Sequence, residues 1–541
     1  MKSYIKYIVP AAAIALTLGM TSCTKDLDVD PINPNLSLDF EPEALYNQCF
    51  ANIAMAGNGG ANGDCDIDGL DGGTTGFIRQ MWNTNELTTD EAICSWGDAG
   101  IQQFDYNTYD ASHPMINGYY ARLTTGISYC NQYINEAGGY NETMTAEIRL
   151  CRALHYYLLM DAFGNIPFTT SLTNPERLTR QEAYEWLEKE LLEIEPMLTE
   201  AKAKKSSDPA YGRPDKASAW MLLMRLYFNA EVYTGSQQWA KAAEYAQKII
   251  TSSGRQLNTQ GSSIGWTAYQ KLFMGDNGES SAAEECILPI LCDGKKTTSW
   301  GTSLYLIAGG WDEDIHGHLY PQTEADKNAL NGTSEKWKGQ RARPDLLKKF
   351  FPSGNAPHVG TKEMMKEAND DRALFYGVDR EIDMPNGYND PYNYGYAVTK
   401  FLNFHSDGSP VSDGQFPDTD LFFFRLAEAY LTYAEATARS NNNVATAKGI
   451  EYINAIRSRA HATTKTGYSM DDILDEWSRE FYWEGRRRVD LIRHGKFGGA
   501  NGYKWTWKGG AYTSRDFAAE KNIFPIPAEQ VKGAITQNPG Y

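Results

Sequence analysis

Apolar residues recur every three or four positions along several stretches of the chain, a spacing that is typical of amphipathic helices. The pattern predicts one helix over Glu147 to Phe163. This helix is expected to end at Gly164, because glycine readily adopts the left-handed conformation that stops a helix. A second amphipathic helix is expected over about Arg180 to Leu198. These stretches indicate a chain built largely of helical hairpins.

A further pair of apolar stripes is spaced like a helix-turn-helix repeat. Its apolar positions are Trp220, Leu223, Tyr227, Trp239, Ala242 and Ala246. The spacing approximates a tetratricopeptide repeat, with Met224 where that repeat usually has glycine. A comparable pair is expected over residues 423–437 and 450–460. Such pairs bury one face only when they stack on neighbours, so the sequence predicts a mostly α fold in which helical hairpins form a curved scaffold.

The helical period fades between about residues 261 and 417, where Gly, Asn, Asp, Pro and Trp accumulate. Loops of this length inside a compact protein are usually functional. We therefore expect residues 41–260 and 418–541 to form the helical scaffold. Residues 261–417 are expected to form a loop-rich region that contacts a ligand.

The stretch from Asp471 to Arg493 is expected to form a helix whose inward face carries Glu484 and Arg488 four residues apart. Its carboxylates are the best sequence candidates for a paired acid and base. An arginine beside a glutamate lowers the glutamate pKa and keeps the group ionised, which is unsuitable for a general acid. The sequence therefore favours a structural clamp over a catalytic site. The carboxylates concerned are Glu476, Glu480, Glu484 and Asp490.

The first residues have the features of an export signal. Lys2 and Lys6 precede an apolar run, Tyr7 to Leu18, that is too short to span a bilayer but suits the core of a secretory signal. Leu18 to Cys23 resembles the lipobox of bacterial lipoproteins, in which the cysteine is lipidated. We therefore expect a signal peptide over residues 1–22, a lipid on Cys23 and a polar tether over 23–40. The alternative is an ordinary signal peptide followed by a coincidental cysteine.

The net charge and the aromatic content indicate what kind of ligand the chain binds. The chain of 541 residues carries a net charge of −18, which disfavours nucleic-acid binding and adhesion to an anionic membrane through a basic patch. Aromatic residues make up 12% of the chain, and broad aromatic faces beside polar amides suit the stacking of sugar rings. Most of these rings are expected to fill helix interfaces. A neutral ligand is favoured.

Motifs for metal binding or catalysis are weak. The cysteines after Cys23 have no regular spacing, so they indicate neither a disulfide framework nor a zinc motif, and most are expected to be buried. His155 lies on an apolar helical stripe, where a hydrogen-bonded core histidine is expected. Residues 261–265 match a serine-hydrolase motif without the required preceding strand, and His316 and His318 are interpreted as part of a turn.

A calcium loop is a further alternative. Asp64, Asp66 and Asp68 alternate before Gly69, as at the start of such a loop, but Thr75 stands where a bidentate glutamate is needed. A solvated turn is the favoured interpretation. We expect no cofactor and assign no metal ligand.

Segments spread over the whole mature chain match one known family in order and spacing. They are Glu86 to Glu91, Glu147 to Arg149, Phe163 to Pro167, Phe424 to Ala436, Ile453 to Ala460, Glu476 to Arg487, Asp490 to Arg493, Phe524 to Pro527 and Gln537 to Tyr541. These segments resemble the SusD/RagB family of surface glycan-binding lipoproteins of Bacteroidetes. The resemblance implies about four tetratricopeptide-like hairpins that bear a loop-rich, ligand-binding face.

The resemblance also implies a function. Members of this family capture oligosaccharide at the cell surface and cap a TonB-dependent SusC-like transporter in the outer membrane, without hydrolysing the glycan. The expected partners are therefore this transporter, an oligosaccharide, and the outer membrane, reached through the lipid on Cys23. The alternative is a subunit of the same type that binds peptide or another nutrient.

Candidate site residues come from two arguments. The resemblance assigns Trp96 to the aromatic arc that holds the sugar, because it follows the segment matching Thr89 to Glu91, and assigns Asp71 and Arg79 to polar contacts nearby. The rest of the arc is expected from the loop-rich region, by composition, with loop packing as the alternative for each residue. These candidates are Trp300, Tyr305, Trp311 and Tyr320.

Overall fold

The structure is a computed structural model that describes residues 41–57, 59–60, 65–315 and 331–541. It divides into two compact units, Met1–Leu45 and Tyr46–Tyr541. The described part of the first unit contains the start of helix α2 (Pro42–Ala54), and the description below concerns the second unit. Among the described residues, no helix combines the length and apolar character needed to cross a membrane.

Some sequence expectations fall outside the described residues. They concern the signal peptide and tether, the lipid on Cys23, the site candidate Tyr320, the pair His316 and His318, and Asp64 of the calcium-like loop. These expectations stay predictions.

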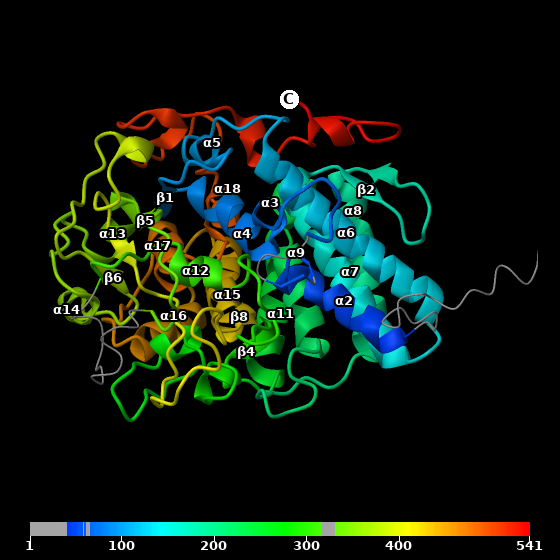
Figure 1. Cartoon of the computed structure of the whole chain (residues 1–541), viewed down its shortest axis with the longest axis horizontal. Coiled ribbons are helices and arrows are strands. Elements are labelled where there is room, and N and C mark those ends of the chain that lie inside the picture. The colour runs from blue at the N-terminus through cyan, green and yellow to red at the C-terminus, as the bar shows by residue number, and fades with distance from the viewer. Residues whose placement is uncertain (1–40, 58, 61–64, 316–330) are drawn as a thin grey trace, which may run out of the picture. The chain divides into compact units, whose positions relative to one another are not determined.

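Packed helices form the scaffold of the second unit (Figure 1). Its longer helices are α6 (Pro114–Ala137), α7 (Glu142–Phe163), α8 (Arg180–Ile194), α9 (Lys216–Phe228), α11 (Trp239–Ser252), α15 (Leu426–Ser440), α16 (Ala447–Arg459) and α17 (Met470–Phe481). In sequence order each of α6, α7, α8, α9 and α11 packs on the next, α11 packs on α15, and α15 contacts both α16 and α17. The predicted mostly α scaffold of packed helical hairpins is confirmed.

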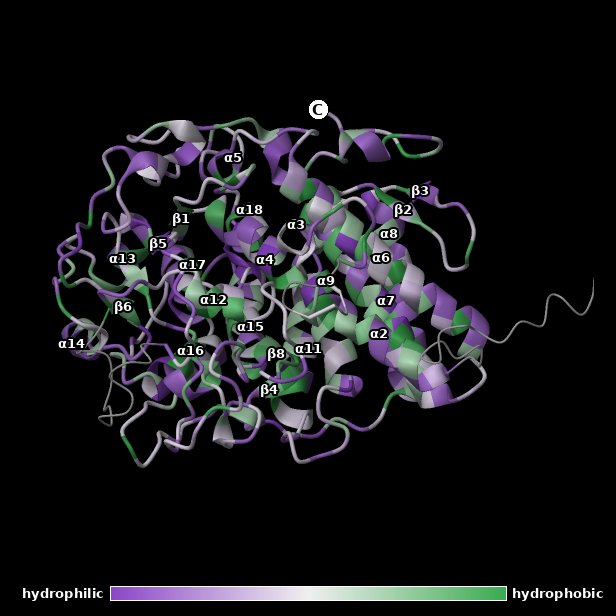
Figure 2. Cartoon of the chain, viewed as in Figure 1, coloured by the Kyte–Doolittle hydropathy of each residue, from purple (hydrophilic) through white to green (hydrophobic). Residues whose placement is uncertain are grey.

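The two helix pairs predicted from apolar stripes, α9 with α11 and α15 with α16, form as expected and pack on each other through α11 and α15. Helix α11 buries Trp239, Ala242 and Ala246, the positions of its apolar stripe. Helix α16 lies so close to α15 that a Cβ on Gly449 would be 3.1 Å from the Cα of Ala434. Figure 2 shows hydrophobic and hydrophilic positions mixed along α6, as expected for a helix with one buried face.

Short elements complete the unit. Shorter helices are α3 (Gly72–Thr75), α4 (Phe77–Trp82), α5 (Ile101–Asp105), α10 (Ala230–Thr234), α12 (Leu304–Ala308), α13 (Pro344–Phe350), α14 (Thr361–Ala368) and α18 (Arg487–Arg493). Two-stranded antiparallel sheets pair β1 (Ala92–Cys94) with β5 (Gln340–Ala342), β2 (Ile166–Phe168) with β3 (Glu176–Leu178), β4 (Cys286–Ile290) with β8 (Leu421–Arg425), and β6 (Phe375–Tyr376) with β7 (Ala397–Val398). In the described part of residues 261–417, no helix exceeds the eight residues of α14.

The prediction of a single helix over residues 471–493 is wrong. Two helices, α17 and α18, occupy this stretch because Trp483 and Gly485 adopt φ angles of 69° and 72°, which a right-handed helix does not contain. The break also separates Glu484 from Arg488. Glu484 instead accepts a hydrogen bond from Lys400 Nζ at 2.7 Å.

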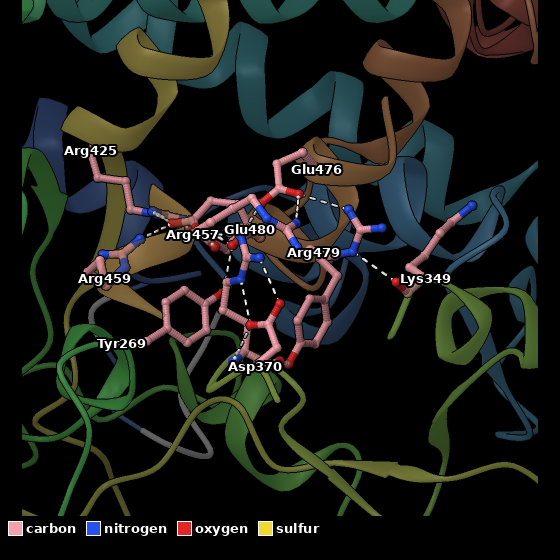
Figure 3. A network of polar contacts seen from close by, with 12 residues as sticks. Tyr269, Lys349, Asp370, Arg425, Arg457, Arg459, Glu476, Arg479 and Glu480 are labelled. Atoms are coloured by element: carbon pink, nitrogen blue, oxygen red, sulfur yellow. Dashed lines mark hydrogen bonds and ion pairs between the residues drawn. The ribbon is translucent and has the colours of Figure 1, made fainter. Parts of the chain in front are cut away.

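Two carboxylates of this stretch, Glu476 and Glu480, belong to a buried ion network (Figure 3). Arg425 donates to Glu480 at 2.6 Å, and Arg372 donates to Glu476 at 2.7 Å. Burial alone would raise the pKa of each glutamate, but the surrounding arginines outweigh it and lower both pKa values to about 2. Both groups are therefore ionised and paired, so the predicted structural clamp is confirmed for these two residues.

Candidate functional site

An aromatic pocket with a volume of about 240 Å³ opens in the second unit. It is lined by Gly73, Arg79, Trp96, Asp98, Trp300, Gly301, Tyr305 and Trp337. These residues come from α3, α4, the turn after β1, helix α12 with the turn before it, and the loop before β5. The pocket therefore brings together segments from both ends of a 265-residue span of sequence, from Gly73 to Trp337.

Strand pairing brings Trp96 to this pocket. In the antiparallel β1–β5 ladder, Cys94 lies opposite Gln340. Trp96, two residues after Cys94, therefore lies beside the loop that leads into β5. Trp96 Nε1 donates a hydrogen bond to the backbone oxygen of Trp337 at 2.8 Å. Gly339 permits the close approach, because a Cβ there would lie 2.1 Å from Trp96 Nε1. The indole is thus held by the opposite loop.

The tryptophans form a curved wall. The ring centroids of Trp96 and Trp337 are 6.2 Å apart with planes at 62°, and those of Trp337 and Trp300 are 6.2 Å apart with planes at 63°. Such edge-to-face contacts stabilise aromatic pairs. Trp337 Nε1 also donates to Glu335 Oε2 at 2.9 Å. All three indoles are half-buried, so each keeps accessible ring surface.

Arg79 supplies the polar part of the pocket. Its Cζ lies 5.4 Å from the ring centroid of Tyr305 and 5.8 Å from that of Trp96, and its Nη2 lies 3.3 Å from Asp98 Oδ1. Burial alone would lower the pKa of Arg79, but Tyr305 and Asp98 raise it overall, so the group stays cationic. Arg79 Nε is buried with no hydrogen-bond partner among the described residues. The Arg79 side chain as a whole is 14% exposed and lines the pocket.

Asp71 lies beside the pocket and does not line it. Its carboxylate caps α3 by accepting hydrogen bonds from Thr74 N at 2.9 Å and Thr74 Oγ1 at 2.6 Å. A Cβ on Gly73 would be 2.8 Å from Arg79 Nη1 and 3.1 Å from Asp71 Oδ1, so the two side chains flank that glycine. In the structure, Asp71 holds the turn that carries Gly73.

The two remaining described candidates differ in position. Tyr305 is 1% exposed and donates to Asn83 Oδ1 at 2.6 Å, so it forms the base of the pocket behind Trp96. Trp311 does not reach the pocket, because it is fully buried in a separate cluster with Trp266. Composition could not distinguish these positions, since exposed and buried rings share one loop-rich segment.

Sequence reasoning missed four lining residues, the glycines Gly73 and Gly301 and the side chains of Trp337 and Asp98. Asp98 follows Trp96 by two positions, and this proximity was an available signal. Trp337 belongs to the same loop-rich segment as the other candidates, and its place depends on the β1–β5 pairing, which no sequence motif announces.

A second cavity, of about 60 Å³, lies within the scaffold. Its charged lining is already paired. Arg225 donates to Glu428 at 2.6 Å, and Asp161 accepts from Tyr233 at 2.7 Å. This volume suits a few water molecules and is too small for a sugar chain.

Two weaker sequence candidates have structural roles. His155 is fully buried, with Nε2 3.0 Å from Asn52 Nδ2 and Nδ1 2.8 Å from the backbone oxygen of Cys151. The predicted core histidine is confirmed. Asp66 pairs with Arg122 at 2.8 Å, so a guanidinium already balances the charge of this carboxylate.

Sequence comparisons identify relatives over the whole chain. A family model described as the SusD family matches residues 298–541. The starch-binding protein SusD of Bacteroides thetaiotaomicron is 37% identical over 583 aligned positions, which cover 99% of this chain and 99% of that protein.

Solved structures are similar in fold. A laminarin-binding SusD-like protein superposes with a TM-score of 0.63 and 21% identity, covering 93% of this chain and 99% of that chain. Surface glycan-binding protein A from Bacteroides thetaiotaomicron, in complex with laminarihexaose, gives a TM-score of 0.62 and 17% identity, covering 92% of this chain and 98% of that chain.

Proposed function

The chain belongs to the SusD family, and we propose that it captures oligosaccharide in its aromatic pocket and delivers it to a TonB-dependent SusC-like transporter. The observation that carries the proposal is the curved wall of Trp96, Trp337 and Trp300, with the guanidinium of Arg79 beside it. The C–H faces of sugar rings stack on indoles, and their hydroxyls accept hydrogen bonds from a guanidinium. The names of the relatives, a starch-binding and a laminarin-binding protein, support a glycan ligand.

The charges in the pocket and the number of stacking rings indicate which sugars bind and how tightly. Arg79 is balanced by Asp98, which favours neutral sugars over strongly charged ones. Each stacked ring contributes about 1 kcal/mol beyond its area burial. With a few hydrogen bonds, this gives dissociation constants from about micromolar to about millimolar. Weak capture of this kind permits release to a transporter.

The proposal also covers where the protein lies in the cell and that it does not hydrolyse the glycan. The lipobox-like segment ending at Cys23 supports lipid anchoring at the outer-membrane surface. The ion-paired state of Glu476 and Glu480 supports a binding protein that leaves the glycan intact, because neither carboxyl is available as a general acid. Release of a Cys23→Ala variant from the membrane fraction tests the anchor, and copurification with a TonB-dependent transporter tests the partner.

Isothermal titration calorimetry tests the ligand directly. The purified chain is titrated with maltoheptaose, laminarihexaose and a peptide pool. We expect saturable binding of at least one oligosaccharide, lost in Trp96→Ala and retained in Tyr140→Ala, a control at an aromatic residue 57% exposed outside the pocket. Binding of peptides alone, or new reducing ends after incubation with glycan, would overturn the proposal.

A further inference from the structure

The backbone of Trp337 is held by hydrogen bonds on both sides, whereas its ring is only half-buried. Its amide N–H donates to the Ala308 carbonyl at 2.9 Å, and its own carbonyl accepts from Trp96 Nε1 at 2.8 Å. The plane of the Trp337 ring therefore depends on its side-chain torsions. The indole N–H is the one polar group of this side chain, so a fixed acceptor for it also fixes the ring.

Glu335 provides that acceptor. Its Oε2 accepts from Trp337 Nε1 at 2.9 Å, and its Oε1 accepts from Gln415 Nε2 at 2.9 Å. The backbone of Glu335 is held as well, because its N–H donates to Thr333 Oγ1 at 3.2 Å and its carbonyl accepts from Asn331 Nδ2 at 2.9 Å. Both carboxylate oxygens thus have partners, and neither Glu335 nor Gln415 lines the pocket.

Gln415 belongs to a turn that also supports Trp300. Asp413 Oδ1 accepts from the backbone N–H of Gln415 at 2.7 Å and from that of Phe416 at 3.0 Å, a pattern that stabilises a turn. The ring centroid of the buried Phe416 lies 5.2 Å from that of Trp300. The same turn thus reaches two tryptophans of the curved wall, one directly and one through the glutamate.

We propose, on the basis of the proposed function, that Glu335 and Gln415 are positioning residues of the glycan site: together they hold the Trp337 ring in the orientation that stacks on a sugar. A sugar stacks on an indole only when the ring face is presented to it. A ring that is free to rotate must be ordered when the ligand binds, and this ordering weakens binding. Both residues act through Trp337 and not through contact with the ligand.

Calorimetry on the full chain tests the role of Glu335, with maltoheptaose and laminarihexaose as probes. We expect affinity to fall about fivefold to tenfold in Glu335→Ala, as for one lost hydrogen bond at a half-buried group. Glu335→Gln should stay within about twofold of the wild type, because its amide oxygen can accept from Trp337 and its amide nitrogen can donate to a rotated Gln415 amide. Glu363→Ala, at an exposed residue outside the pocket, is the control.

An exchange of the two side chains tests the link to Gln415. Gln415→Glu places two carboxylates side by side, so it should lower affinity as Glu335→Ala does. The double variant Glu335→Gln with Gln415→Glu again pairs an amide with a carboxylate, so affinity should recover to within about twofold of the wild type. Absence of recovery in the folded double variant would remove Gln415 from the proposal.

Nuclear magnetic resonance reports the position of the ring without any glycan. In protein labelled with nitrogen-15 tryptophan, the indole N–H signal of Trp337 is assigned by its absence from Trp337→Phe. We expect this signal to move upfield in Glu335→Ala and to stay near its wild-type position in Glu335→Gln.

Circular dichroism and urea unfolding show whether each variant is folded. An unmoved Trp337 signal, or unchanged affinity in folded Glu335→Ala, would overturn the proposal. A signal that moves as expected in a protein whose wild type binds neither glycan would overturn the proposed function and still support the hold of Glu335 on the ring.

Discussion

Trp96 Nε1 donates a hydrogen bond to the backbone oxygen of Trp337 at 2.8 Å, across 241 positions of sequence. The polar edge of the indole is therefore satisfied by the protein, and what Trp96 can present to a ligand is its ring surface. Because the acceptor lies on the backbone beside β5, the orientation of Trp96 depends on the β1–β5 pairing.

Gly339→Ala should disable the pocket without a change at any lining residue. The new Cβ would meet Trp96 Nε1 at 2.1 Å, so the indole must move and its hydrogen bond to Trp337 must break. We expect glycan affinity to fall at least tenfold in calorimetry, with an unchanged circular dichroism spectrum. Gly97→Ala is the matched control, since a Cβ there meets no atom within 4 Å. Equal affinity in the two variants would contradict this account.

Tryptophan substitutions should distinguish residues that bind glycan from residues that only stabilise the core. Trp337→Ala is expected to weaken glycan binding as strongly as Trp96→Ala, because it removes the middle of the curved wall. Trp311→Phe is expected to leave affinity unchanged and to lower the free energy of unfolding by about 1–3 kcal/mol, since it opens a cavity in a buried cluster. Calorimetry and urea unfolding measure the two effects. Lost affinity in folded Trp311→Phe would place this residue in the site after all.

Arg79→Gln should weaken binding by about 1.5–3 kcal/mol, the range for hydrogen bonds made by a charged group. The variant removes the guanidinium that lies against Trp96 and Tyr305. Asp71→Asn serves as the comparison, because asparagine also caps helices and Asp71 does not line the pocket. Binding that is lost in Asp71→Asn and kept in Arg79→Gln would reverse the assigned roles.

Glu480→Gln should destabilise the protein by about 3–5 kcal/mol, because it leaves buried arginines without their counter-charge. Arg425 and Arg459 both bond to this carboxylate. The exposed Glu363→Gln is the control. Urea denaturation measures the free energy of unfolding, and an unchanged midpoint for Glu480→Gln would refute a stabilising role for the network.

Mild acid should lower stability partly through His113. Burial lowers the pKa of this residue to about 4, although its ring nitrogen contacts the Gly100 carbonyl. Because the unfolded-state pKa is about 6.5, the unfolded chain binds more protons below that pH, so stability is complete above about 6.5 and falls toward about 4. Urea unfolding across this interval should show a shallower pH dependence in His113→Asn, whose side chain can still cap α6. An identical slope would exclude this contribution.

Local patterns account for much of the fold. The stripe of Trp239, Ala242 and Ala246 marked the face that α11 buries, because a helix brings residues three and four apart to the same side. The same reasoning failed at residues 471–493, where the spacing predicted one continuous helix but the backbone turns at Trp483 and Gly485. Apolar spacing reports which side chains are buried and not every turn between them.

The site, too, was predicted only in part. The resemblance to the SusD/RagB family assigned Trp96 and Arg79, whereas Trp337 was not found and Trp311 proved buried.

The amino-acid sequence by itself determined the helical class, the family and the residue types suited to sugar stacking, because periodicity and short motifs are properties of neighbouring positions. Only the tertiary structure decided which tryptophans share a pocket and which are buried in the core. Those outcomes depend on strand register and helix packing between segments that are far apart along the chain, such as β1 with β5.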